Sequence, residues 1–138
     1  MSATLISTLT EQHRELEGLM QKVTVALHSN ELAAVRATLH EFGHALLMHL
    51  ALEDEQLYPQ LLKQHSMRSS NGRLVRTFAE NMMRVSTALK TFLKRPQETE
   101  EDVAALRREW PEVENLLASR IQSEERLLYP TVDLAASP

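Results

Sequence analysis

The chain has 138 residues, a formal net charge of -4 at pH 7 and a sequence pI near 5.9. This length suits a single domain over residues 1–138, built around one hydrophobic core. The acidic balance gives no overall attraction to nucleic acid or to an anionic membrane. Cysteine is absent, which excludes disulfides, thiolate zinc sites and iron–sulfur clusters. Any metal site must therefore use imidazole and carboxylate ligands.

The sequence also lacks the patterns of several common protein classes. Its N-terminal segment has neither the basic start nor the apolar run of a secretory signal. No window approaches the roughly 18 apolar residues of a membrane helix. We therefore expect a cytoplasmic protein that binds neither membrane nor nucleic acid directly. No Ser-His-Asp arrangement, phosphate-binding loop or dinucleotide fingerprint appears, so the sequence favours a binding protein over an enzyme.

Apolar residues recur with a helical period through almost the whole chain, and only 3 Gly and 5 Pro occur. Strand signals are missing, so the predicted fold class is all-α. The first helix is predicted at about residues 4–27. A short connection follows at 28–30, in which Asn30 is expected to cap the second helix by accepting backbone N–H bonds. Because the connection is so short, these two helices should be antiparallel neighbours.

The second helix is expected to continue as far as Tyr58 and Pro59, where proline removes a backbone donor. It should then resume for a short stretch. A loop at residues 67–72 leads to a third helix over about 73–94, whose apolar stripe contains no ionisable side chain.

The fourth helix is predicted to begin at Thr99, because Asp102 three residues later completes the pattern of a capping box. Pro111 lies inside this helix. The unbroken heptad of apolar residues across Pro111 favours one bent helix over two. Four such helices joined by short loops pack best as an up-down-up-down antiparallel bundle.

Nearly every polar residue that interrupts the apolar stripes is a histidine, a glutamate or an arginine. These residues are His13 in the first helix, His49 and Glu53 in the second, and Arg120 and Glu124 in the fourth. Charged side chains are seldom fully buried unless they are paired or bound to metal. The five residues are therefore the candidates for a functional site.

Two of the segments that contain these residues have similar sequences. The segment HLALEDEQLYP, which begins at His49, aligns with RIQSEERLLYP, which begins at Arg120, 71 residues later. The alignment pairs Glu53 with Glu124. Each half of the chain thus looks like a helix pair with an inward acidic group near the end of its second helix. His13 is predicted within about one helical turn of His49, so we expect it to lie near the same site.

With these residues the chain resembles the hemerythrin-like (HHE cation-binding) family over nearly its whole length. The family's four-helix bundle holds iron, usually as a diiron centre. Its ligands are a histidine on the first helix, H-x-x-x-E on the second, a histidine on the third, and H-x-x-x-E or H-x-x-x-D on the fourth. By this resemblance, His13, His49 and Glu53 take the first three ligand positions and Glu124 takes the last.

The second half of the chain departs from the family's pattern. Arg120 stands where the fourth-helix histidine is expected, and the third helix has no histidine, so that Phe78 or Met82 occupies that layer. Too few ligands remain for two irons, and a guanidinium that cannot be deprotonated would repel a nearby divalent ion. Arg120 could instead donate to Glu53 and Glu124 and compensate their charge in place of a metal.

Two functional interpretations follow. The first is a bundle with an incomplete iron site and no bound cofactor, which acts as a non-enzymatic binding or regulatory protein. The second is a metal-binding protein with a residual mononuclear or diiron site, used for sensing or storage of O2, NO or iron. The segment RIQSEERLL is also similar to the last helix of the bacterial regulator-of-sigma-D family. This similarity implies a transcription regulator or sigma factor as protein partner.

Overall fold

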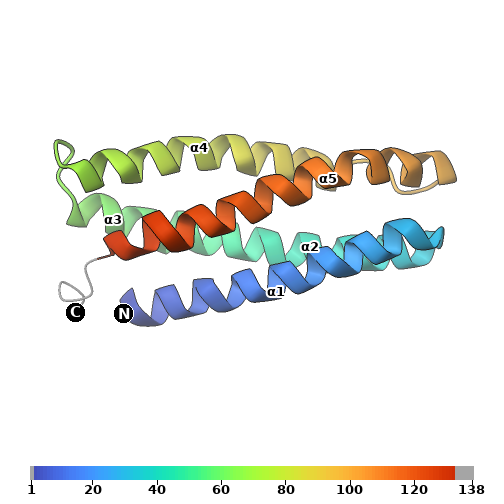
Figure 1. The fold of residues 1–138 in the computed structure, drawn as a ribbon, viewed down its shortest axis with the longest axis horizontal. Coiled ribbons are helices and arrows are strands. Elements are labelled where there is room, and N and C mark those ends of the chain that lie inside the picture. The colour runs from blue at the N-terminus through green and yellow to red at the C-terminus, as the bar shows by residue number, and fades with distance from the viewer. Residues whose placement is uncertain (1, 133–138) are drawn as a thin grey trace.

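The structure is a computed structural model that describes residues 2–132, and within this range every regular element is helical. Figure 1 shows an elongated bundle in which consecutive long helices run in opposite directions, so that the first and the last described residues lie at the same end. The predicted all-α, up-down-up-down four-helix bundle is therefore confirmed. The long helices are α1 (Ser2–Ser29), α2 (Leu32–Leu52), α4 (Ser70–Leu93) and α5 (Glu100–Ser123).

The second and fourth long helices each continue through a π-helical turn. The extensions are η1 (Glu53–Leu57) and α3 (Tyr58–Gln64) after α2, and η2 (Glu124–Leu128) and the 3-10 turn η3 (Tyr129–Thr131) after α5. Both π-helical turns have five residues and begin at one of the two inward glutamates. The repeat seen in the sequence is thus also a repeat in backbone geometry.

A π-helical turn winds more slowly than an α-helical turn, so it shifts the inward stripe by about one residue. In the sequence, the apolar stripe of the fourth helix continues at a constant heptad spacing from Glu124 to Leu127, which predicts that Leu127 faces the core. Instead Leu127 is 53% exposed and Leu128 is fully buried. This prediction was wrong because the heptad count assumed an α-helical pitch through η2.

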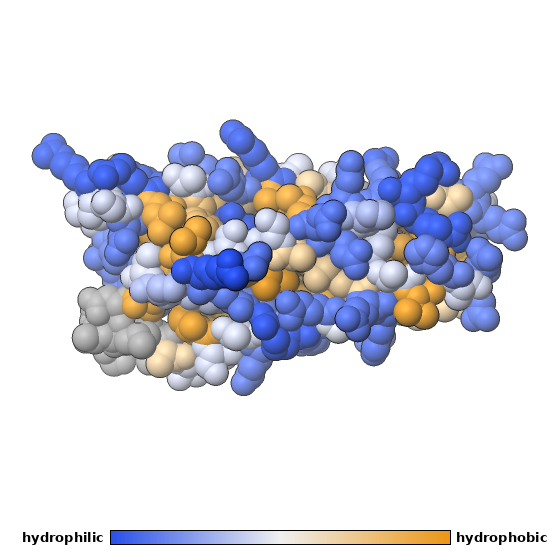
Figure 2. Space-filling model, in the orientation of Figure 1, coloured by the Kyte–Doolittle hydropathy of each residue, from blue (hydrophilic) through white to orange (hydrophobic). Residues whose placement is uncertain are grey.

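The core consists of apolar side chains from all four long helices and from the extensions. Burying each large aliphatic or aromatic side chain contributes about 1.5–3 kcal/mol, so these contacts dominate the stability of the bundle. On the face that Figure 2 shows, polar residues predominate and apolar residues form smaller patches among them. The largest apolar side chains with almost no exposure are Phe42, Leu9, Leu16, Leu27, Leu46, Leu57, Leu61, Leu89, Leu106 and Leu128.

The connection between α1 and α2 differs from the prediction. Asn30 has a φ of 61°, in the left-handed region that asparagine tolerates, and it follows the last residue of α1. It therefore ends α1 and does not cap α2. The residue before α2 is Glu31, whose side chain makes no capping hydrogen bond. The side chain of Asn30 instead accepts a hydrogen bond from Arg107 on α5 at 2.9 Å.

Helix α4 begins at Ser70, three residues earlier than predicted, because the preceding loop contains its own cap. The hydroxyl of Ser69 accepts a hydrogen bond from the backbone N–H of Gly72 at 2.9 Å. Gly72 is required here because a Cβ at this position would lie 1.9 Å from the carbonyl oxygen of Ser66. These short-range contacts extend the helix into a segment that the sequence pattern assigned to a loop.

Helix α5 follows the prediction closely. The hydroxyl of Thr99 accepts from the backbone N–H of Asp102, and the carboxylate of Asp102 accepts from the backbone N–H of Thr99, both at 3.1 Å. This confirms the capping box. Pro111 lies inside one continuous helix, as the heptad pattern favoured. Beside it, the indole N–H of Trp110 donates to the hydroxyl of Thr24 at 2.8 Å and ties α5 to α1. Within residues 2–132, no helix has the length and apolar content needed to cross a bilayer.

Candidate metal centre

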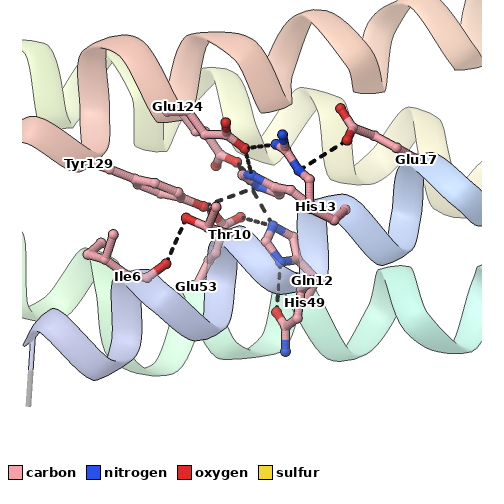
Figure 3. A network of polar contacts seen from close by, with 11 residues as sticks. Ile6, Thr10, Gln12, His13, Glu17, His49, Glu53, Glu124 and Tyr129 are labelled. Atoms are coloured by element: carbon pink, nitrogen blue, oxygen red, sulfur yellow. Dashed lines mark hydrogen bonds and ion pairs between the residues drawn. The ribbon is translucent and has the colours of Figure 1, made fainter.

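Four helical elements bring four of the predicted site residues together inside the bundle. His13 comes from α1, His49 from the last turn of α2, Glu53 from the start of η1 and Glu124 from the start of η2. One ligand atom from each of the four lies within 4.8 Å of all the others. Their exposed fractions are between 0% and 2%. Figure 3 shows the four side chains pointing toward one another.

The inner ring nitrogens of both histidines face the carboxylates. His13 Nε2 lies 3.1 Å from Glu124 Oε1, and His49 Nε2 lies 3.9 Å from the same oxygen. His49 Nε2 also lies 3.5 Å from Glu53 Oε1, one helical turn later in the chain. A nitrogen lone pair and a carboxylate oxygen are both acceptors, so each of these contacts requires a proton or a cation between the two atoms.

Each histidine is held from outside by a second hydrogen bond. His13 Nδ1–H donates to Glu125 Oε2 at 2.7 Å, and His49 Nδ1–H donates to Gln12 Oε1 at 2.8 Å. An acceptor at Nδ1 places a proton there, so that Nε2 faces inward, where it can bind a metal or, when it also carries a proton, donate to Glu124. Arg14 in turn forms an ion pair with Glu125. The outer partners thus orient both imidazoles toward the centre of the cluster.

Tyr129 completes the ring of contacts. Its hydroxyl donates to Glu53 Oε2 at 3.2 Å and lies 3.2 Å from His13 Nε2. The Tyr129 ring stacks on the His13 ring, with centroids 5.5 Å apart and an interplanar angle of 9°. Tyr129 therefore orients one carboxylate and one imidazole of the cluster at the same time.

The two buried carboxyl groups differ in their charge state. Burial raises the pKa of Glu53 well above its ordinary value, and the neighbouring negative charge of Glu124 raises it further. Burial also opposes ionisation of Glu124, but hydrogen bonds from His13 and His49 outweigh burial and lower the pKa of Glu124 to about 2. Without a cation, the cluster therefore holds a protonated Glu53 beside an ionised Glu124.

Four buried side-chain polar atoms in the described part of the chain have no hydrogen-bond partner, and all four belong to this region. They are Glu53 Oε1, Glu124 Oε2, Tyr58 Oη and Arg120 Nε. Such atoms each cost roughly 1–3 kcal/mol, which makes their grouping notable. Two of them are carboxylate oxygens, which are ligands for divalent cations. The residues present therefore fit a bound cation.

Arg120 contacts Phe78 on α4 and forms no ion pair with the two glutamates among the described residues. Its Nη2 donates to the backbone carbonyl of Phe78 at 2.6 Å, and its guanidinium carbon lies 4.4 Å from the centre of the Phe78 ring. Among residues 2–132 Arg120 makes no ion pair within 4.0 Å, so the expected hydrogen bonds to Glu53 and Glu124 are not formed. Its positive charge acts on Glu53 at longer range and lowers the pKa of that carboxyl against the effect of burial.

The third long helix, α4, contributes apolar side chains beside Arg120, as expected. Phe78 packs against Arg120, and Met82, one turn later on α4, is also buried. The positions that carry histidines in the family's diiron pattern thus hold an aromatic ring and a guanidinium. Within residues 2–132, His13, His49, Glu53 and Glu124 form one group of side chains that could hold a metal ion.

Several residues of the site were missed by sequence reasoning. Gln12 and Glu125 flank predicted ligands, but nothing in the stripe pattern shows that they reach the outer nitrogens. Tyr58 and Tyr129 were visible as part of the repeated segment, at the same distance after each glutamate. That recurrence is the signal that could have identified them.

Comparison with known proteins agrees with this geometry. The family model of the hemerythrin HHE cation-binding domain matches residues 4–132. Neither a curated protein nor a solved structure gives a significant match. The match covers nearly the whole chain, including His13, His49, Glu53 and Glu124. The chain therefore belongs to the hemerythrin HHE cation-binding domain family.

Proposed function

We propose that this protein is a non-enzymatic binding protein that holds one divalent transition-metal ion between His13, His49, Glu53 and Glu124. The observation that carries the proposal is the presence of four buried ligand atoms within 4.8 Å of one another. Two imidazoles and two carboxylates suit Fe(II), Mn(II) or Zn(II). The chain belongs to a cation-binding family, and the resemblance to hemerythrin-like proteins implies iron. A bound ion would supply Lewis acidity and, for iron, redox chemistry to a ligand that reaches it.

The chain's own residues support a bound cation over the cofactor-free alternative. The unpartnered oxygens of Glu53 and Glu124 face the interior, and Arg120 does not pair with either of them. Gln12 and Glu125 hold the imidazoles so that Nε2 of each faces the cluster. A cation would therefore find its ligands already oriented, and burial of the cluster excludes bulk water from it.

Metal titration tests this function. We expect the chelator-treated protein to bind one Fe(II) per chain under anaerobic conditions, measured by titration and elemental analysis. His49→Ala should lose most of this affinity, because it removes a ligand and leaves Glu53 and Glu124 without the neighbouring imidazole. His44→Ala is the matched control, because His44 lies on the same helix but is exposed. No bound metal in the parent protein, or two ions per chain, would contradict the proposal.

We further propose that a protein partner distinguishes the cation-bound form of this protein from the cation-free form. The two glutamate ligands begin the π-helical turns that lead into α3 and η3. Nε2 of His65, at the end of α3, lies 2.5 Å from the carbonyl oxygen of Thr131 in η3. This contact links α3 to η3. Large apolar side chains are exposed near this end of the bundle, including Leu62, Met67 and Leu127. A cation that alters the positions of the two glutamates would therefore also alter this surface.

The resemblance to sigma-binding bundles identifies the partner to test first. Purified sigma factor should bind the cation-free and the loaded protein with different affinities, measured by fluorescence anisotropy. Leu127→Lys should weaken this binding without changing metal affinity, because Leu127 points away from the ligand cluster. Absence of binding by both forms would exclude a sigma factor as the partner.

A further inference from the structure

Helix α4 and the segments on either side of it concentrate the positive charge of the chain. Residues 56–97 contain eight of the 15 Lys and Arg residues but only one, Glu80, of the 19 Asp and Glu residues. This segment therefore carries a formal charge of +7 and the rest of the chain carries -11, although the whole chain has only -4. The eight basic residues are Lys63, Arg68, Arg73, Arg76, Arg84, Lys90, Lys94 and Arg95.

Most of this positive charge is not compensated inside the molecule. Arg95 pairs with Glu109 at 2.7 Å. None of the other seven basic side chains forms an ion pair with another described residue. Arg73, for example, donates to the backbone carbonyl of Arg68 at 2.6 Å, which is a neutral acceptor. These side chains therefore produce a local positive field that an acidic molecule can use for docking.

Five of the unpaired basic side chains share the solvent-facing side of α4. Helical spacing places them opposite the buried stripe of this helix, together with Met83 and with Glu80 as the one acidic residue. Figures 1 and 2 share an orientation, and hydrophilic side chains project along the edge where α4 lies. We name as the basic surface the set Arg73, Arg76, Met83, Arg84, Lys90 and Lys94.

A partly apolar hollow opens at the edge of the basic surface, between α4 and the segment η1–α3. Met83 is 74% exposed, so it presents a large flexible apolar side chain to solvent beside positive charge. Methionine adapts its shape to irregular apolar partners. The surface therefore suits a partner that combines acidic side chains with an apolar one. The hollow has a volume of about 380 Å³ and is lined by Asp54, Tyr58, Ala79, Met82, Met83, Ser86, Thr87 and Lys90.

An acidic protein segment fits this surface better than a nucleic acid or an anionic membrane. Asp54 lines the hollow and Glu80 lies within the face, so a continuous row of phosphates would meet two carboxylates. No residue of the basic surface is aromatic, whereas nucleic-acid bases commonly stack on aromatic rings. The charge of -11 on the rest of the chain repels a long polyanion. A short segment experiences mainly the local field, because salt screens more distant charges.

We propose that the basic surface binds an acidic amphipathic segment of a protein partner, and that one apolar side chain of this segment enters the hollow beside Met83. The carboxylates of the segment pair with basic side chains such as Arg84 and Lys90 and direct the association, while the apolar contact fixes its position. The inference goes beyond the proposed cation site, because α4 supplies none of the four ligands.

A fluorescein-labelled helical peptide made of glutamate, alanine and leucine, with its leucines on one face, tests the proposal by fluorescence anisotropy. We expect saturable binding to the parent protein at low ionic strength, and weaker binding as the salt concentration rises. A second peptide with serine in place of leucine should bind several-fold more weakly, because it makes no apolar contact with Met83 or the hollow.

Charge reversal locates the binding surface. Arg84→Glu combined with Lys90→Glu should weaken binding of the leucine peptide by about ten-fold, because each change replaces an attraction with a repulsion. The matched control combines Lys22→Glu with Arg108→Glu, which changes the net charge equally at two exposed positions outside α4. Met83→Ser should weaken binding of the leucine peptide by about three-fold and leave binding of the serine peptide unchanged.

Circular dichroism checks that each variant is folded, and Met83→Ser provides a test even where the charge-reversed variant does not fold. No binding by the parent protein, equal weakening by the two double variants, or equal binding of the two peptides would overturn the inference. Tighter binding of duplex DNA or of phosphatidylglycerol vesicles than of the leucine peptide would also overturn it. Each of these results leaves the proposed function standing, because the metal content of the same samples is measured separately.

Discussion

Glu53 shows at the scale of one residue how a binding site and a stable core impose opposite requirements. Its carboxyl is fully buried, one of its oxygens has no partner, and the carboxylate of Glu124 lies nearby. An ionised ligand is useful to a cation but costly to the cation-free fold. The cation-free protein should therefore be destabilised by the same carboxyl that the cation requires.

Glu53→Gln tests this conflict. The folded-state pKa of Glu53 is raised above the ordinary value of 4.5, so its contribution to stability is fully present below that value and is lost as pH rises through the folded pKa. Glutamine mimics the protonated form and avoids this loss. With chelator present at neutral pH, the variant should be more stable by about 1–3 kcal/mol in urea denaturation, and the gain should shrink at pH 4. A less stable variant at neutral pH would contradict this account of Glu53.

Glu125 acts on the cluster through His13, because its carboxylate accepts a hydrogen bond from the outer ring nitrogen, Nδ1, of His13. Glu125→Ala frees the imidazole to change its tautomer and orientation, so metal affinity should fall by about 10–100-fold, measured by competition with a chromophoric chelator. Glu17→Ala is the control, because Glu17 is an exposed partner of the same Arg14 but does not touch His13. Equal affinities of the two variants would show that Glu125 does not position His13.

At the scale of elements, helix ends and helical turns set where the site lies. The sequence predicted the capping box at Thr99 and the continuity of α5 through Pro111, because both follow from local patterns. It did not predict the left-handed conformation of Asn30 or the cap at Ser69, since these depend on which of two adjacent helices uses a polar loop residue. The π-helical turns were also missed, because a heptad count assumes constant pitch.

Asp102 provides a test at the start of α5. Hydrogen bonds from the backbone N–H groups of Glu98 and Thr99 lower the pKa of Asp102 below its ordinary 3.8. Its contribution is therefore present above that pH and is lost as pH falls through the folded pKa. Asp102→Ala should lower Tm at pH 7, whereas the difference from the parent protein should shrink as the pH falls below the ordinary pKa of 3.8. The neighbouring Glu101→Ala should leave Tm almost unchanged, and an equal loss in both variants would argue against the cap.

At the scale of the whole molecule, the repeat of two helix pairs brings two similar segments, one beginning at His49 and the other at Arg120, to the axis of the bundle. The two segments contribute different side chains there. The first supplies His49 and Glu53, and the second supplies Glu124 with Arg120 in the place of a histidine. Inward stripes made the cluster predictable from sequence. The direction of Arg120 was not predictable, because a stripe fixes the side of the helix but not whether a long side chain reaches a carboxylate or a backbone carbonyl.

The most direct measurement is anomalous diffraction from crystals of the iron-loaded protein, collected on both sides of the iron absorption edge. We predict one anomalous peak per chain inside the bundle, within bonding distance of His13, His49, Glu53 and Glu124. Two peaks, or a cluster without any peak in crystals of protein soaked with iron, would contradict the central claim that this bundle binds a single cation.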